Sequence, residues 1–116
     1  MKLKLIVALV EDERTQLVID SAREAGATGA TVITSVRGEG LKPTKTFLGL
    51  DLSGQRDVVL LIVAEARARE ILETIAKAGQ FDEVPGAGIA FQLDVDDAIG
   101  MSTQLPTLMH EIEDEV

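Results

Sequence analysis

Residues 57–64 read Asp-Val-Val-Leu-Leu-Ile-Val-Ala, and this run decides the fold class. An apolar run of this kind, rich in β-branched side chains, is typical of a central strand buried on both faces. Residues 66–78 follow with apolar side chains at helical spacing, and Gly79 ends that pattern. Residues 89–95 then place apolar side chains at every second position, which indicates a further strand. The second half of the chain therefore predicts a strand, a helix and a strand in succession.

The first half of the chain repeats this order. Residues 2–10 begin with alternation and become continuously apolar, which predicts a strand. A helix is expected after Asp12, its candidate N-cap, with Gly26 at its end, and residues 31–36 are rich in β-branched side chains. Two tandem βαβ units predict an α+β, ferredoxin-like βαββαβ fold, in which a four-stranded antiparallel sheet carries two helices on one face. The other sheet face needs a cover, so we expect self-association.

Composition excludes several classes of site. The chain has 116 residues, a formal net charge of −9 and only 3% aromatic residues, which argues against binding of nucleic acid. It has no cysteine and one histidine, His110, which excludes thiol catalysis, cysteine-bound metals and sites that need two imidazoles. No apolar run approaches about 20 residues, so we expect no direct membrane insertion and a cytoplasmic protein. We find no catalytic constellation and predict that the chain is not an enzyme.

Charge is distributed unevenly along the chain. All 11 Lys and Arg residues precede position 78, whereas nine of the 20 Asp and Glu residues follow it. Residues 104–116 form an acidic C-terminal tail, in which four apolar residues from Leu105 to Ile112 have helical spacing. We expect this tail to form a short amphipathic helix that packs on its own domain or on a sister subunit.

Three glycine-containing segments lie beside the expected strands: residues 26–32, 37–40 and 85–88. Glycines at such places allow the backbone to approach a ligand closely and expose N–H groups to anions. Each segment taken alone favours an ordinary turn. Their joint position in a βαββαβ chain is much more specific and points to a phosphate site.

At these glycines the sequence resembles the P-II signal-transduction family. The matching parts are Lys4-Leu-Ile-Val-Ala8, the segment Gly26-Ala-Thr-Gly-Ala-Thr-Val…Val-Arg-Gly-Glu-Gly40, and Gly86-Ala87-Gly88 followed by Phe91 and Asp94-Val95. The resemblance covers nearly all of residues 2–96. We therefore assign residues 1–103 to one P-II-like domain, followed by the tail.

The resemblance implies a homotrimer that binds adenine nucleotides in the clefts between subunits and acts as a regulator. The family's protruding T-loop corresponds to about residues 41–55, and its phosphate-facing B-loop to about residues 82–88. Members report nitrogen, carbon or energy status through the T-loop to target proteins such as membrane transporters and metabolic enzymes. The resemblance thus implies an adenine nucleotide as effector and no obligatory cofactor.

Family positions can be carried over to this chain one at a time. The resemblance places six nucleotide-binding residues here: Thr31 against the adenine, Ile62 in an apolar wall, Gly38 and Gly40 at the base of the T-loop, and Gly86 and Gly88 in the B-loop.

The chain departs from the family where phosphates are held. Ile89 stands where a basic residue usually follows the B-loop glycines, and residues 97–102 lack the expected arginines. The remaining candidates for phosphate contacts are Arg37, Lys42 and Lys45, with Arg56 also nearby. Because each charge-assisted hydrogen bond is worth roughly 1.5–3 kcal/mol, we expect AMP or ADP to bind in preference to ATP.

The T-loop is shorter than in the family and lacks the tyrosine that is modified in some members. Its apolar residues Phe47, Leu48 and Leu50 are candidates for a partner-binding surface. The alternative is that residues 46–52 extend the hairpin between the flanking strands and pack on the trimer.

Other functions stay open from the sequence. The chain could be a trimeric docking subunit with a vestigial nucleotide cleft and no effector, in which case no small molecule would stabilise it. A small acyl-phosphate hydrolase is disfavoured, because a suitable loop with an arginine–asparagine pair is absent. The group Asp94, Asp96 and Asp97 favours a solvated strand end over a metal site, so no metal is predicted.

Overall fold

The computed structural model describes residues 2–37, 46–47, 50–51 and 55–100. The elements in chain order are β1 (Leu3–Glu11), a 3-10 turn (Asp12–Arg14), α1 (Thr15–Glu24), β2 (Thr31–Val36), β3 (Thr46–Phe47), β4 (Leu50–Asp51), β5 (Arg56–Ala64), α2 (Glu65–Ala78) and β6 (Gly88–Val95).

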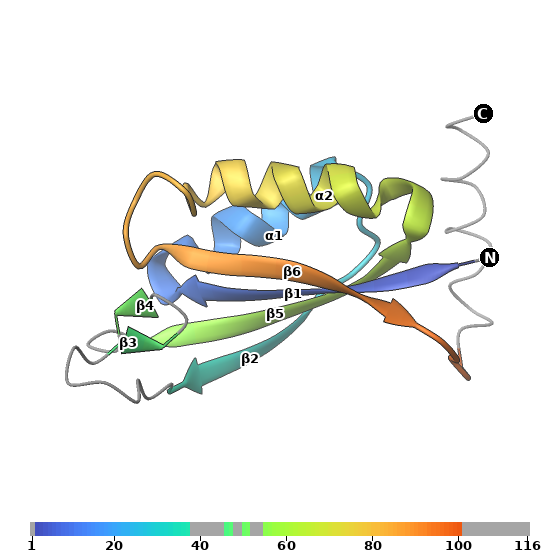
Figure 1. The fold of residues 1–116 in the computed structure, drawn as a ribbon, viewed down its shortest axis with the longest axis horizontal. Helices are drawn as coiled ribbons and strands as arrows, with labels where there is room; N and C mark the ends of the chain where they lie inside the picture. Colours follow the sequence, from blue (N-terminus) through green and yellow to red (C-terminus); the bar gives the residue numbers. More distant parts are fainter. Residues whose placement is uncertain (1, 38–45, 48–49, 52–54, 101–116) are drawn as a thin grey trace.

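One antiparallel sheet contains β2, β5, β1 and β6 in that order, and both helices cover the same face of it (Figure 1). The α+β, ferredoxin-like fold predicted from the sequence is therefore confirmed. The two apolar runs form the two central strands, β1 and β5, as predicted. In this chain only the face under the helices is fully buried, and Ile62 on the other face of β5 is exposed.

Alternation along the central strands separates the two faces of the sheet. On β1, Ile6, Ala8 and Val10 are fully buried in the core under the helices, and on β5 Val59 and Leu61 are buried with them. Burial of each such Val, Leu or Ile side chain contributes roughly 1.5–3 kcal/mol. The residues between them point to the helix-free face, because successive side chains of a strand alternate.

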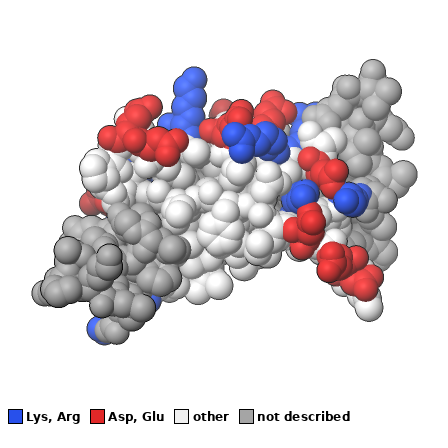
Figure 2. All heavy atoms as spheres, in the orientation of Figure 1, with Lys and Arg blue, Asp and Glu red and all other residues white. Residues whose placement is uncertain are grey.

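The helices fill the core with residues three or four positions apart. α1 contributes Val18 and Ala22, and α2 contributes Ala68, Ile71 and Ile75. This spacing places the buried side chains of each helix on one face, so the charged side chains lie outward. Figure 2 shows acidic and basic side chains gathered along the helices.

Both helices end in the same hydrogen-bonded motif with different residues in the left-handed position. After α1, Gly26 has φ 114°, and the Ala27 amide donates to the Ala22 carbonyl over 2.9 Å. After α2, Gln80 has φ 57°, and the Phe81 amide donates to the Ala76 carbonyl over 3.0 Å. A glycine adopts this conformation without steric cost and a glutamine does not, so the second helix end carries strain that the first avoids.

The prediction that Asp12 caps α1 is wrong. Residues 12–14 form the 3-10 turn, α1 begins at Thr15, and its N-cap Arg14 makes no side-chain capping hydrogen bond. Thr15 Oγ1 instead donates to Asp57 Oδ2 over 2.7 Å in buried surroundings. The start of α1 is thus tied to β5 by a side chain of the helix itself.

Within the T-loop range, β3 and β4 pair with each other through Thr46 with Asp51 and Phe47 with Leu50. They form a separate two-stranded sheet. The alternative in which residues 46–52 extend the hairpin of β2 and β5 and pack on the trimer stays a prediction, because residues 38–45, 48–49 and 52–54 lie outside the described part of the chain.

Candidate nucleotide site

A groove opens on the helix-free face of the sheet where β2 begins. Its volume is about 340 Å³, and its lining is formed by Leu5, Leu60, Ile62 and residues 28–31. Thr31 pairs with Leu60 and Leu5 pairs with Ile62, so three neighbouring strands supply the floor. We call this region the groove end. It brings together Thr31 and Ile62, the two residues predicted to contact the adenine ring and its apolar surroundings.

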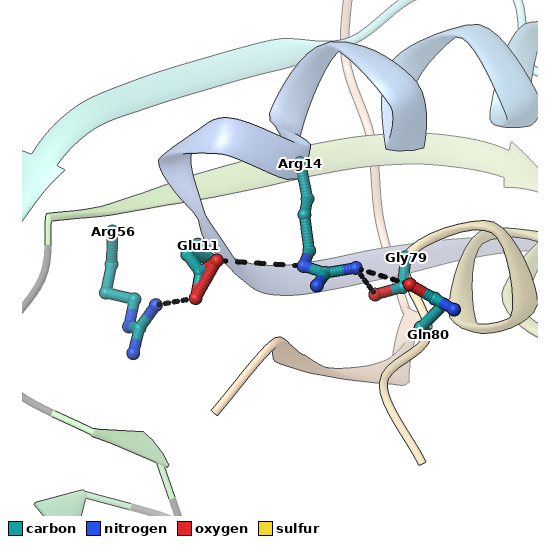
Figure 3. Close-up of polar contacts among 5 residues, drawn as sticks. All are labelled: Glu11, Arg14, Arg56, Gly79 and Gln80. Carbon is teal, nitrogen blue, oxygen red and sulfur yellow. Dashed lines mark hydrogen bonds and ion pairs between the residues drawn. The ribbon is translucent and has the colours of Figure 1, made fainter. Parts of the chain in front are cut away.

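The opposite end of the sheet carries a polar cluster, which we call the arginine end: Glu11, Arg14 and Arg56. The Glu11 carboxylate lies between the two guanidinium groups (Figure 3). Its Oε2 is 3.6 Å from Arg56 Nη1, and its Oε1 is 3.7 Å from Arg14 Nε. One carboxylate therefore serves two cations, and the three side chains together carry one net positive charge.

Arg14 extends this cluster to the end of α2. Its Nη1 donates to the Gly79 carbonyl over 3.1 Å and to Gln80 Oε1 over 3.0 Å (Figure 3). These contacts hold the side chain of Gln80, the residue with the strained backbone. The arginine end thus reaches the segment that leads into the B-loop.

Backbone hydrogen bonds fix the same junction. The Glu11 amide donates to the Ala87 carbonyl over 3.0 Å, and the Asp12 amide donates to the Gln55 carbonyl over 3.3 Å. The end of β1 therefore connects the last residue of the T-loop range with the B-loop. A displacement of the backbone at Glu11 would alter the hydrogen bond to Ala87 in the B-loop and the neighbouring hydrogen bond from Asp12 to Gln55.

The two B-loop glycines, Gly86 and Gly88, are favoured over other residues for different structural reasons. Gly86 has φ 79°, a conformation that favours glycine. Gly88 opens β6 and lies against the Phe81 ring: a Cβ at Gly88 would be 2.5 Å from Phe81 Cε1 and 2.9 Å from the Leu9 carbonyl oxygen. Gly88 is thus needed for packing, a role that the sequence alone does not reveal.

The predicted nucleotide residues do not all lie together in one chain. Thr31 begins β2 and pairs with Leu60, whereas Val36 ends β2 and pairs with Arg56. Their partners Leu60 and Arg56 are four residues apart on β5, which corresponds to roughly 13 Å. The groove end and the arginine end are therefore at opposite ends of the same sheet.

The remaining predicted residues lie around the T-loop. Arg37 follows β2 directly and is exposed. Phe47 and Leu50 pair in the two-stranded sheet. Gly38, Gly40, Lys42, Lys45 and Leu48 lie outside the described residues.

Sequence reasoning missed the part played by Glu11 and Arg14. It treated the acids after the first strand as a helix N-terminus, although Glu11 is the last residue of β1. The available signal was the i, i+3 spacing of Glu11 and Arg14, which permits an ion pair but does not identify the third member. Arg56 lies 45 positions away, so only the strand register brings it to Glu11.

At the other end of β1, Lys4 forms a hydrogen-bonded ion pair with Asp94. The hydrogen bond and charge of Lys4 lower the pKa of Asp94, and the same contact raises the pKa of Lys4. Among the described residues, no three His, Cys, Asp or Glu side chains are grouped as metal ligands would be. Asp94 is thus a partner of Lys4.

None of the helices in the described part of the chain has the length and apolar character needed to cross a membrane.

The described part of the chain thus combines a ferredoxin-like sheet, a groove on its helix-free face and a glycine-bearing loop at the opposite end. The model of one family, Nitrogen regulatory protein P-II, matches residues 3–104. The chain belongs to this family, whose members are regulators rather than enzymes. A comparison with curated proteins gave no significant match.

Solved structures of PII-like proteins resemble the chain over most of its length. A PII-like signalling protein of Thermus thermophilus is 27% identical with a TM-score of 0.60, and the match covers 82% of this chain and 88% of that one. CPII of Thiomonas intermedia, bound to ADP, AMP and acetate, is 19% identical with a TM-score of 0.60, covering 83% and 90%. The apo form of CPII gives 20% identity, a TM-score of 0.62 and coverage of 82% and 90%.

Proposed function

We propose that the chain is a cytoplasmic signal-transduction regulator that acts as a homotrimer in nitrogen or carbon metabolism. Each cleft between subunits binds an adenine nucleotide, AMP or ADP in preference to ATP, and the T-loop acts on a target protein. The target is a membrane transporter or a metabolic enzyme. P-II family proteins are trimers that interact with target proteins, which supports this assignment.

The separation of the two ends carries the proposal. Thr31 and Ile62 lie in the groove end, whereas Gly86 and Gly88 lie beside the arginine end. A nucleotide that uses both sets needs the groove end of one subunit next to the arginine end of another. Contacts between two different patches of identical chains are heterologous, and such contacts form a ring when the rotation that relates the chains closes after three copies, as in the proposed trimer.

The helix-free sheet face supplies the surface for such a ring. Large apolar side chains are exposed on it, including Ile33 (48%), Ile62 (39%), Phe91 (38%) and Leu93 (49%). Figure 2 shows an uncharged surface across the middle of the molecule, below the charged helices. Large apolar side chains exposed on one uncharged face mark an interface, and a second copy of the chain covers this face in the proposed trimer.

The charges at the arginine end support the preference for fewer phosphates. Its three side chains provide a single net positive charge, and two further acids, Asp12 and Glu13, follow in the chain. AMP carries about two negative charges and ATP about four, so repulsion increases with each phosphate. CPII of Thiomonas intermedia, whose fold this chain shares, was crystallised with ADP and AMP.

The path from the cleft to the target follows from the order of the chain. The T-loop range ends at Gln55, whose carbonyl accepts from Asp12, and β5 begins with Arg56. A nucleotide at the arginine end contacts the residues that anchor the T-loop. It therefore favours one T-loop conformation, which the target recognises by its differential affinity.

Calorimetric titration with AMP, ADP and ATP, with and without magnesium, tests the proposed function. We expect saturable binding of AMP and ADP, weaker binding of ATP, and a trimer by light scattering. Thr31→Ala should lower the affinity at least several-fold, whereas Thr34→Ala, an exposed threonine on the same strand, should not. Absence of heat with every nucleotide would reject the effector and favour the docking subunit with a vestigial cleft.

Mixed trimers test whether each cleft uses two chains. A Thr31→Arg chain has a defective groove end. An Arg37→Glu chain has a defective arginine end, because Arg37 follows Val36, which pairs with Arg56. Neither homotrimer should bind nucleotide. Trimers reassembled from both chains should regain binding in a fraction of their clefts, because an intact groove end then meets an intact arginine end. No recovery in verified mixed trimers would contradict a site shared between subunits.

A further inference from the structure

We propose that Glu11 is the specificity residue that disfavours nucleotides with longer phosphate chains. The inference rests on the proposed function, because it concerns which nucleotide the same cleft accepts. The Glu11 carboxylate forms ion pairs with Arg14 and Arg56, and it therefore competes with the phosphates of an incoming nucleotide for these two arginines.

The geometry of the cluster gives Glu11 this position. Its two carboxylate oxygens are divided between Arg56 at 3.6 Å and Arg14 at 3.7 Å, so both guanidinium groups face the same carboxylate (Figure 3). Arg14 is fixed from its other side by Gly79 and Gln80. The cations therefore cannot turn to a phosphate without weakening their contact with Glu11.

Exposure shows which member of the cluster meets an anion first. The side chain of Glu11 is 32% exposed, whereas that of Arg56 is only 6% exposed. Solvent thus reaches the carboxylate more readily than the guanidinium behind it. A phosphate that approaches Arg56 must displace the carboxylate or remain in its repulsive field.

Glu11 is also next to the loop on which the phosphates would lie. Its amide donates to the carbonyl of Ala87, which stands between Gly86 and Gly88. This hydrogen bond holds the last residue of β1 against the B-loop. The carboxylate is therefore tied to the phosphate end of the proposed cleft.

Repulsion from one fixed carboxylate grows with the number of phosphates. Each added phosphate brings about one more negative charge, and the interaction is strengthened where water is partly excluded. AMP is least affected, ADP more and ATP most. Removal of the Glu11 charge should therefore increase affinity for ATP more than affinity for AMP.

The test is calorimetric titration of AMP, ADP and ATP into wild-type protein and the Glu11→Gln variant, first without magnesium and then with it. Glutamine preserves the size of the side chain and removes its charge. We expect the ratio of ATP to AMP affinity to rise roughly tenfold, with ADP intermediate. Glu13→Gln is the matched control, because it removes the same charge from an exposed position two residues away, and it should leave the ratio within about twofold of wild type.

A second variant keeps the inference testable if Glu11→Gln folds poorly. Arg14→Gln removes a cation and leaves the carboxylate in place, so it should lower the ratio of ATP affinity to AMP affinity.

An unchanged ratio in Glu11→Gln, or an equal change in Glu13→Gln, would overturn the role of Glu11 while AMP binding still supports the proposed function. Loss of ATP affinity in Glu11→Gln only when magnesium is present would also overturn it, because Glu11 would then be a metal ligand. Absence of binding by wild type and every variant would reject the proposed function itself.

Discussion

The two ends of the sheet differ in how closely their residues are packed. The groove end is open: its lining is mostly apolar or glycine, and a Cβ added at Gly29 would meet nothing within 4 Å. The arginine end is crowded: a Cβ at Gly79 or Gly88 would come within 2.5 Å of the Phe81 ring. The groove end therefore has free space around its glycine, whereas the glycines near the arginine end are in close contact with a neighbouring ring.

The same contrast applies to polar contacts. Near the arginine end, Thr15 and Asp57 share a buried hydrogen bond, and Asp57 is only 9% exposed. At the other end of β1, Lys4 and Asp94 form an ion pair at the surface. Interactions of similar chemistry should therefore differ in their contribution to stability, which gives direct ways to test the comparison.

The largest effect on stability is expected at Gly88. Gly88→Ala places a methyl group against the Phe81 ring and the Leu9 carbonyl, so it should lower the free energy of unfolding by about 1–3 kcal/mol. Gly29→Ala is the matched control at the groove end and should change it by less than about 0.5 kcal/mol. Urea denaturation at one protein concentration measures both. Equal effects would mean that the two ends are packed alike.

A smaller effect is expected for the buried hydrogen bond. Thr15→Val keeps the shape of the side chain but leaves Asp57 Oδ2 without this donor, which should cost about 1–2 kcal/mol. Thr31→Val, at an exposed position of the groove end, should change stability by less than about 0.5 kcal/mol. Denaturation curves for the two variants give the comparison. A Thr15→Val protein as stable as wild type would show that this bond does not anchor α1.

The smallest effect is expected for the Lys4–Asp94 pair, and it should depend on pH. Because the folded pKa of Asp94 is lowered, its stabilisation is present above about pH 4 and is lost as the pH falls through the folded pKa. Because the folded pKa of Lys4 is raised, its stabilisation is present below about pH 10 and is lost as the pH rises through the folded pKa. The urea midpoints of wild type and Asp94→Asn should therefore differ slightly near neutral pH and converge at both extremes. A difference independent of pH would assign the effect to another cause.

The fold could be predicted from the sequence because its signals are local. Apolar runs, helical spacing and glycines located all four strands of the main sheet and both helices within one or two residues. The ends of the helices were less predictable. Gly79 is the C-cap of α2, as expected, but the residue with a left-handed backbone conformation is Gln80, and glutamine has no preference for that conformation. Its side-chain contact with Arg14 depends on tertiary packing.

The candidate site was predictable to the extent that it follows family positions. Thr31 and Ile62 were expected on grounds of resemblance, and the groove that joins them is formed by strand pairing. Glu11, Arg14 and Arg56 were not expected to act together, because their contact depends on the register of β1 with β5. Interactions between distant residues require the sheet to be known before they can be seen.

The ring of Phe81, held between Gly79 and Gly88, also has an evolutionary consequence. The Cε1 atom of the ring would be 2.4 Å from a Cβ at one glycine and 2.5 Å from a Cβ at the other. A larger residue at either glycine would therefore clash with the ring. A smaller residue at position 81 would remove the clash at Gly79, whereas a Cβ at Gly88 would still lie 2.9 Å from the Leu9 carbonyl oxygen. We expect positions 79 and 81 to covary among relatives, so that side chains larger than glycine at 79 occur together with a small residue at 81, while position 88 stays glycine.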